Sequence, residues 1–503
     1  MTRRTTALVV ALALLLSACA AIETPLGDLG GDAGAEQPAQ PPRAVTAPPA
    51  ETATVVPAAD PAEATLGVTR ILWQEAPVVL VAPSGDQTAA AAAATAAADL
   101  PAPVLLLPSG TGDAGTVTDE LGRLGVTTVV TYGTVDDASL GDVEVVASTD
   151  PDAAPEVQPP DPLPQVVVLT GTDPALAPAR ATAEAAGARV TESGTPDPRA
   201  DSAVVQAIAA EPVEHVVAVG EEFGDLERLW WRTQVAATGV ELPGGGQVLF
   251  PGRRLVALYG HPGTSSLGVL GEQGPEESVE RAQQLASEYE PFSDEPVLPA
   301  FEIIATVASS FPGTDGDYSN EAEIETLRPH VDAAAEAGVY VVLDLQPGRT
   351  DFLTQARLYE ELLRLPHVGL ALDPEWRLGP NQVHLRQIGR VDAAEIEEVA
   401  DWLAGIVREE RLPQKMLLLH QFRMSMITER ETLDATRDEL AYLVQMDGDG
   451  APGDKFATWD ALKQDPPEGL FFGWKNFYDE DTPTFSPEET FAVEPKPWWV
   501  SYQ

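Results

Sequence analysis

Residues 369–376, Gly369-Leu370-Ala371-Leu372-Asp373-Pro374-Glu375-Trp376, form a short apolar run that stops at an acid, a proline and a second acid. Such a run, bounded by a turn signal, is typical of a strand buried on both faces of a parallel sheet. Similar runs, predicted to be strands, occupy 255–258, 301–307, 340–343, 416–419, 440–445, 470–473 and 498–501. Helical patterns, such as 278–289, 321–337, 352–365 and 393–410, lie between several of them. Eight strands with helical crossovers in about 250 residues indicate a (β/α)8 barrel of the TIM type over 251–503, with an open α/β sheet as the alternative.

Polar residues follow most of the predicted strands. In a barrel of this type, functional side chains come from the C-terminal strand ends and the loops after them. In strand order, the candidates are Tyr259, His261, Asp344, Gln346, Asp373, Glu375, His420, Gln421, Asp447 and Lys475. Trp376 and Trp474 are added as pocket residues because flat aromatic rings pack against the apolar faces of ligands such as sugars.

Asp373 and Glu375 are the most informative pair. In an extended chain, residues two apart face the same side at about 6.6 Å, which predicts that both carboxyl groups face one pocket. Glycoside hydrolysis requires two nearby carboxyl groups in unequal environments. The pair resembles the catalytic signature of barrel glycoside hydrolases, including lysozyme-like muramidases and the chitinase-like superfamily. The resemblance implies that Glu375 is the general acid and Asp373 its partner, although the alternating aspartates of the chitinase-like proteins are absent and Pro374 interrupts the motif.

Each of these assignments has a structural alternative. Asp373 is also suited to cap a turn before Pro374, which would leave Glu375 in solvent. Asp344 either orients the catalytic pair or caps a helix. His420 is either a proton relay or sugar ligand, or a hydrogen-bonded histidine at the edge of the core.

No cofactor or metal ion is expected. The six histidines have no metal-ligand spacing, which argues against zinc. The acidic loops 315–319 and 447–450 alternate oxygen ligands as calcium sites do, but they lack the closing glutamate of an EF-hand and also fit solvated loops. No glycine-rich nucleotide loop follows any predicted strand, so no nucleotide is expected.

Residues 66–250 are predicted to form a Rossmann-like α/β region, because short Val/Leu runs alternate with alanine-rich helical stretches in a weak internal repeat. The segments 78–86, 103–108 and 120–126 resemble the cell wall-binding repeats of Gram-positive surface proteins. The resemblance implies association with envelope polymers. The usual opening box of that family is missing, and only Val68-Thr69-Arg70-Ile71 stands in its place. A spacer without a ligand is the alternative.

The N-terminus has the layout of a bacterial secretion signal. Arg3 and Arg4 precede an apolar run, and Leu16-Ser17-Ala18-Cys19 resembles a lipobox. The resemblance implies cleavage after residue 18, lipidation of Cys19 and anchoring on the extracytoplasmic face of the cell membrane. An ordinary secretory peptide is the alternative. Residues 19–65, rich in alanine, proline and glutamate, are predicted to be a disordered tether.

The charge balance excludes one class of partner. The chain has 79 acidic and 30 basic residues, a net charge of −49, which repels phosphate backbones and argues against nucleic acid. We therefore expect a lipid-anchored envelope protein whose barrel binds or hydrolyses a glycan. A non-catalytic surface lipoprotein and a solute-binding lipoprotein are the alternatives.

Overall fold

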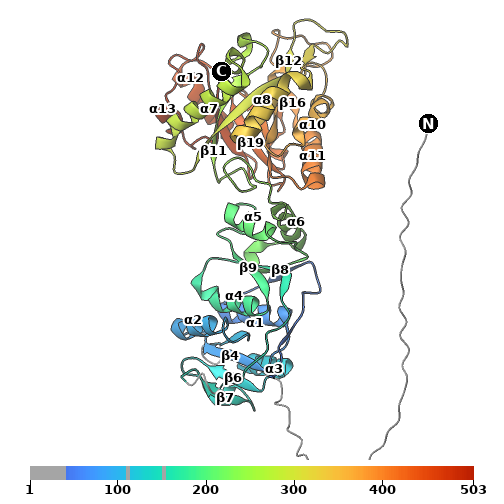
Figure 1. The fold of residues 1–503 in the computed structure, drawn as a ribbon. Coiled ribbons are helices and arrows are strands. Elements are labelled where there is room, and N and C mark those ends of the chain that lie inside the picture. The colour runs from blue at the N-terminus through green and yellow to red at the C-terminus, as the bar shows by residue number, and fades with distance from the viewer. Residues whose placement is uncertain (1–40, 109–113, 150–153) are drawn as a thin grey trace, which may run out of the picture. The chain divides into compact units, whose positions relative to one another are not determined.

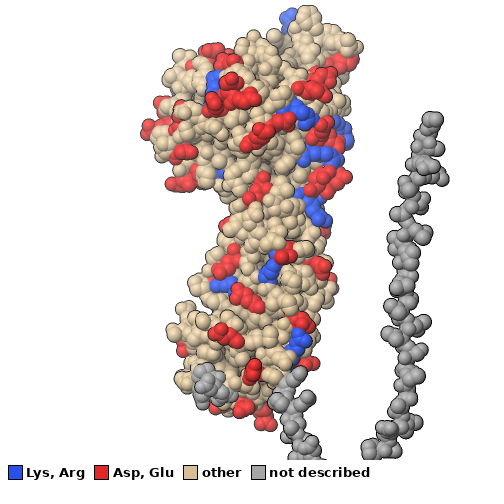
Figure 2. Space-filling view, in the orientation of Figure 1, with Lys and Arg blue, Asp and Glu red and all other residues tan. Residues whose placement is uncertain are grey.

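The computed structural model of the protein describes residues 41–108, 114–149 and 154–503. The predicted signal segment, Cys19 and the first part of the predicted tether lie outside these ranges. Within the described residues, no helix combines the length and the apolar content needed to cross a bilayer. Acidic side chains are spread over the visible face, as Figure 2 shows.

The C-terminal half is a closed barrel of eight parallel strands (Figure 1). The strands are β11 Arg254–Gly260, β12 Val297–Ala308, β14 Tyr340–Leu345, β15 Val368–Leu372, β17 Lys415–Gln421, β19 Leu440–Met446, β20 Phe471–Asn476 and β21 Trp499–Tyr502. Closure occurs because β11 pairs in parallel with both β12 and β21. All eight predicted strands are present, so the prediction of a TIM-type barrel is confirmed at the level of the strands.

Helices connect most of the barrel strands. They are α7 Pro275–Tyr289, α8 Ile324–Ala337, α9 Phe352–Ala356, α10 Glu360–Leu363, α11 Ala393–Glu410, α12 Pro452–Leu462 and α13 Pro487–Phe491. The longest, α11, buries Ile396, Val399, Leu403 and Val407, whose spacing of three and four residues makes one apolar stripe. Between β17 and β19 the chain has only short 3-10 turns and the two-residue strand β18 Ile427–Thr428, which pairs with β16 Val391–Asp392.

Side chains alternate along each barrel strand, so every second residue faces the interior. Toward the N-terminal ends, the interior positions form an apolar layer: Ala257, Ala300, Val342, Ala371, Leu418, Leu443 and Trp499. Gly473 completes it, because a Cβ there would lie 2.9 Å from the Leu443 side chain. Leu249 and Phe250, from the segment before β11, pack into the same cluster.

Two residues further along each strand, the side chains that face the interior are polar or charged. These positions hold Tyr259, Glu302, Asp344, Asp373, His420, Gln445, Lys475 and Ser501. All eight are between 0 and 3% exposed. We call this set the polar layer. It stands directly under the C-terminal mouth of the barrel, where sites occur in this architecture.

The region before the barrel contains two four-stranded sheets with parallel pairing. One has the order β5-β4-β6-β7, with strands Val104–Leu107, Val78–Pro83, Thr128–Thr131 and Glu144–Ala147. The other has the order β2-β10-β8-β9, with strands Ala53–Val56, His215–Val219, Leu163–Thr170 and Ala188–Glu192. The associated helices are α1 Pro61–Leu72, α2 Gln87–Ala96, α3 Ala114–Leu124, α4 Ala177–Ala185, α5 Ser202–Ala209 and α6 Leu226–Ala236. A small antiparallel pair joins β1 Val45–Thr46 to β3 Trp73–Glu75.

The last part of the predicted tether is ordered, which corrects the expectation for residues 19–65. Strand β2 pairs in parallel with β10, and α1 begins at Pro61 with the Asp60 side chain accepting hydrogen bonds from the amides of Ala62 and Glu63. The average composition of residues 19–65 does not reveal the four-residue strand β2 or the helix start at Asp60. A short strand needs few apolar residues when it is added to the edge of a sheet that already exists.

Candidate active site

A pocket of about 410 Å³ opens above the polar layer. It brings together seven of the residues predicted from the sequence: Tyr259, Gln346, Asp373, Glu375, Trp376, Asp447 and Lys475. Ile304, Phe422, Phe477 and Asp449 also line it. A larger hollow of about 670 Å³, lined partly by Asp315, Asp317 and Glu321, lies elsewhere. The mouth of the barrel is the better candidate because a buried acid, Asp373, and a buried base, Lys475, both line it beside Glu375.

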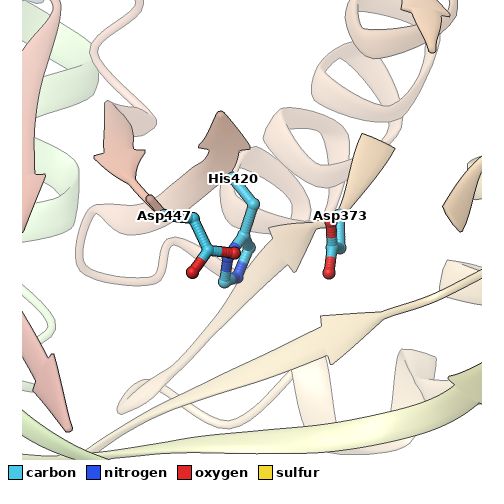
Figure 3. A group of neighbouring side chains, drawn as sticks. All are labelled: Asp373, His420 and Asp447. Atoms are coloured by element: carbon cyan, nitrogen blue, oxygen red, sulfur yellow. The ribbon is translucent and has the colours of Figure 1, made fainter. Parts of the chain in front are cut away.

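His420 is the centre of the polar layer. Its Nδ1 lies 2.8 Å from Asp447 Oδ2, and its Nε2 lies 2.7 Å from Glu302 Oε1 and 3.6 Å from Asp344 Oδ1. The contact with Glu302 is a close ion pair without hydrogen-bond alignment. Burial lowers the pKa of His420, but the surrounding carboxylates outweigh burial and raise that pKa well above its ordinary value. The surrounding carboxylates thus favour the charged form of the imidazole. Figure 3 shows His420 beside Asp447, with Asp373 just beyond the end of the neighbouring strand β15.

Asp447 is held in the ionised state. Burial raises its pKa, but Lys475 and His420 together lower that pKa to about 2. The Lys475 Nζ atom lies 3.0 Å from Asp447 Oδ1 and 3.7 Å from the centroid of the Tyr259 ring. His420 and Lys475 are both almost fully buried, and they hold the Asp447 carboxylate through both of its oxygens at the floor of the pocket.

Asp344 and Tyr259 form a second pair. The Tyr259 hydroxyl donates a hydrogen bond to Asp344 Oδ2 at 3.1 Å, and Gln346 Nε2 donates one to the Tyr259 oxygen at 3.3 Å. Burial raises the pKa of Asp344 to about 6, against the opposing effect of His420. The Asp344 side chain thus belongs to the polar layer.

Asp373 and Glu375 both line the pocket, but the chain between them is not extended. Pro374–Trp376 is a 3-10 helix, and Asp373 Oδ1 accepts a hydrogen bond from the Glu375 amide at 3.3 Å. The assumption of extended geometry was wrong because proline at the first position of a helical turn is already in the helical conformation. Asp373 therefore does cap a turn, as the structural alternative expected, while still lining the pocket.

The two carboxyl groups differ in exposure. Burial, followed by the charges of Glu375 and Asp344, raises the pKa of Asp373 well above its ordinary value, although His420 opposes this. Glu375 is half-buried, and its carboxyl group makes no hydrogen bond or ion pair with the described residues. Burial and the Asp447 charge raise the pKa of Glu375 to about 7, while Lys475 opposes them. Glu375 is thus an unpaired acid that faces the pocket and titrates near neutral pH.

Three residues predicted for the site are placed elsewhere. The His261 Nδ1 accepts a hydrogen bond from the Gly263 amide at 2.9 Å, within its own loop. Gln421 is bonded to Arg430 at 2.9 Å and donates to the Arg423 carbonyl. Trp474 stacks on Phe485, with centroids 5.5 Å apart, in the layer between the barrel and its helices. Trp474 precedes Lys475 by one residue, so it faces the opposite side of β20.

Glu302, Gln445 and Ser501 belong to the polar layer but were not predicted. Gln445 donates a hydrogen bond to the Ser501 hydroxyl at 3.0 Å. Glu302 stands alone inside the apolar run of β12, and it is fully buried. A single acid at an inward position of an apolar strand was the available signal, because an acid is rarely buried without a partner.

Two groups of three side chains in the described residues lie close enough together to hold a metal ion. Ligand atoms of Asp373, His420 and Asp447 lie within 4.8 Å of one another, as do those of Asp315, Asp317 and Glu321. In the first group, both His420 ring nitrogens already face carboxylates: Nδ1 lies 2.8 Å from Asp447 Oδ2, and Nε2 lies 2.7 Å from Glu302 Oε1. In the second group, Asp317 already accepts from the Ser319 amide and the Thr350 hydroxyl.

The mouth of the barrel thus brings together an unpaired carboxyl group whose pKa is raised to about 7 and a second carboxyl group whose pKa is lowered to about 2. Comparison of the chain with known protein families and with curated proteins finds no match.

Proposed function

We propose that the barrel hydrolyses a glycosidic bond in the pocket at its C-terminal mouth. One observation carries the proposal: two carboxyl groups whose pKa values are shifted in opposite directions line the same pocket. The pKa of Glu375 is raised to about 7 and that of Asp447 is lowered to about 2. When the surroundings of two carboxyl groups separate their pKa values in this way, the group with the higher pKa is suited to be the acid and the other to be the anion.

Glu375 is the proposed general acid, because it is protonated in part at neutral pH and its carboxyl group is free to reach a leaving oxygen. Asp447 is the proposed anion that stabilises positive charge at the anomeric carbon. Lys475 and His420 hold Asp447 in place from below. The family resemblance implies Asp373 in that role, but its raised pKa favours a neutral carboxyl group that donates a hydrogen bond to the substrate.

The lining of the pocket supports a sugar as the substrate. Tyr259, Trp376, Phe422 and Phe477 supply aromatic rings around the acids. Aromatic rings offer flat apolar faces, and sugars present similar faces through their C–H groups. The combination of rings and carboxyl groups in one mouth suits glycan binding better than it suits a purely apolar ligand.

The location of the protein is a separate proposal that rests on sequence motifs. The lipobox-like Leu16-Ser17-Ala18-Cys19 supports anchoring through Cys19 on the extracytoplasmic face. The segments that resemble cell wall-binding repeats support association with an envelope polymer. Both are consistent with a glycan substrate that lies within reach of the membrane surface.

The test is a hydrolysis screen of the purified protein on peptidoglycan, chitin-type oligomers and neutral polysaccharides, with release of reducing ends as the readout. Glu375→Gln is compared with Glu336→Gln, a matched change at an exposed position on α8. We expect the first variant to lose about 10²–10⁴-fold in kcat and the second to match the native protein. Activity unchanged in Glu375→Gln would overturn the assignment. Binding of a sugar without turnover would instead favour the solute-binding alternative.

A further inference from the structure

Glu302 differs from the other acids of the polar layer. It is fully buried and does not line the pocket. Asp344 accepts a hydrogen bond from the Tyr259 hydroxyl, and Asp373 accepts one from a backbone amide, but neither oxygen of Glu302 has a hydrogen-bond partner among the described residues. Its one ion pair in that part of the chain is with His420, whose Nε2 lies 2.7 Å from Glu302 Oε1. The described contacts therefore connect Glu302 to the pocket only through His420.

The ring of His420 stands between two carboxyl groups. Its other nitrogen, Nδ1, lies 2.8 Å from Asp447 Oδ2. A neutral imidazole has one N–H group and one lone pair, so only the doubly protonated ring presents a proton to both carboxylates. In a neutral ring, a lone pair would face a carboxylate oxygen at 2.7 or 2.8 Å and would be repelled. The geometry thus favours the imidazolium as long as both carboxyl groups are ionised.

Other titratable groups surround the pair of His420 and Asp447. They come from other strands and from the loops after them: Tyr259, Asp344, Asp373, Glu375 and Lys475. Asp344 is the nearest rival of Glu302, because its Oδ1 lies 3.6 Å from His420 Nε2. The other oxygen of Asp344 is engaged by the Tyr259 hydroxyl. Among the described carboxyl groups, Glu302 therefore makes the closest contact with this nitrogen.

Resting on the proposed glycosidase function, we infer that Glu302 is a positioning residue for that reaction: its buried carboxylate keeps the His420 ring doubly protonated, and the imidazolium holds Asp447 as the anion below the substrate. Glu302 itself lies outside the pocket lining, so it acts through His420. Without Glu302, the ring can become neutral and still donate its Nδ1 proton to Asp447. Asp447 would then keep this hydrogen bond but would face one cation, Lys475, in place of two.

The first test determines the charge of His420 and needs no substrate. Nitrogen-15 NMR of protein labelled at the histidine rings distinguishes a doubly protonated ring from a neutral one, and the signal absent from His420→Gln identifies residue 420. In the native protein we expect both ring nitrogens to be protonated from about pH 6 to about pH 9. Glu302→Gln keeps the shape of the side chain and removes its charge, so the ring should become neutral within that range. Glu336→Gln, the same change at an exposed position, should leave the ring doubly protonated.

The reciprocal variant, Asp447→Asn, keeps the proposal testable if Glu302→Gln does not fold. Glu302 remains in this variant, and Nδ1 can donate to the amide oxygen that replaces the carboxylate, so the ring should stay doubly protonated at neutral pH. A neutral ring at neutral pH in the native protein or in Asp447→Asn would overturn the inference. So would a ring in Glu302→Gln that stays doubly protonated up to about pH 9.

The second test connects that charge to the reaction, on the peptidoglycan and chitin-type oligomers of the hydrolysis screen. In Glu302→Gln, kcat should fall about tenfold while KM stays near the native value, because the lost interaction acts on Asp447 and not on substrate binding. Glu302→Asp keeps the charge and should recover most of the lost kcat. A role in packing alone predicts the opposite order, because the shorter side chain leaves a cavity.

The outcomes separate the inference from the proposed function. A neutral His420 in Glu302→Gln together with the native kcat would overturn the inference and leave the proposed function standing. If the native protein hydrolyses no glycan of the screen, the proposed function fails, and the role of Glu302 in it fails as well.

Discussion

The two interior layers of the barrel are built by the same strands and are equally buried, yet one is apolar and the other carries acids and bases. In the apolar layer, residues such as Leu418 and Leu443 pack against each other and against Phe250. Two positions further along the same strands, His420 and Gln445 occupy the polar layer. The backbone geometry does not change between them, so the difference is one of position relative to the open mouth.

The apolar layer contributes to stability, whereas the polar layer supports the proposed chemistry. Burying an acid costs free energy unless the acid is paired. In the polar layer, a chain of ion pairs offsets that cost: it joins Glu302 to His420, and His420 to Lys475 through Asp447, which lies just above the layer. Lys475 and His420 in this chain lower the pKa of Asp447. Burial and then the Asp447 charge raise the pKa of Glu375, while Lys475 and His420 oppose them. The apolar layer needs no such compensation and stabilises the barrel by burial alone.

The largest effect is expected when the ion-pair chain of the polar layer is broken. Lys475→Met removes the cation beside Asp447 and leaves that carboxylate with His420 alone. Removing one partner of a buried pair costs about 3–5 kcal/mol in the free energy of unfolding, which denaturant titration measures. Activity on the substrate should fall as well, because the pKa of Asp447 rises. Full stability and activity in this variant would show that the chain does not hold Asp447.

A matched change in the apolar layer should affect stability alone. Leu418→Ala leaves a cavity beside Leu443, and such changes cost about 2–5 kcal/mol in the free energy of unfolding. The kcat of the folded variant should stay near that of the native protein. If kcat fell as far in Leu418→Ala as we expect in Lys475→Met, the two layers would not have distinct roles.

The pH dependence sharpens the same distinction. Glu375 must be protonated to act as the acid, so kcat/KM should be full below about pH 7 and should fall about tenfold per unit above it. Asp447 has a pKa of about 2 and therefore stays ionised at every pH well above 2. It should not cause kcat/KM to fall on the acidic side of the profile in that range. A pH–rate profile checks this expectation. A profile that is flat through neutral pH, or that rises there, would assign the acid to another group.

The smallest effect is expected at the aromatic wall. Trp376 lines the pocket, and its ring centroid lies 5.2 Å from that of His384. Trp376→Ala removes one stacking face, worth about 0.5–1.5 kcal/mol, so KM should rise about two- to tenfold with little change in kcat. Trp474→Phe, on the outer side of β20, serves as the control and should leave KM unchanged.

The sequence predicts the barrel well because every strand is buried on both faces and therefore stands out as an apolar run. It predicts the site less completely. Glu302 lies inside such an apolar run. Trp474 is adjacent to Lys475 in β20, and the alternation of side chains along a strand would have placed it on the outward face. Pro374 turns the chain where an extended strand was expected. Strand β2 was missed because its burial depends on β10, a strand about 160 residues away along the chain.

The most direct test of the account is the titration of the Glu375 carboxyl group. Carbon-13 NMR of protein labelled at the glutamate carboxyl carbon follows each group with pH, and the resonance absent from Glu375→Gln identifies residue 375. We predict a midpoint near pH 7, set by burial and by the Asp447 charge, and a lower midpoint in Asp447→Asn. A midpoint at the ordinary glutamate value of about 4.3 in the native protein would contradict the assignment of Glu375 as the acid.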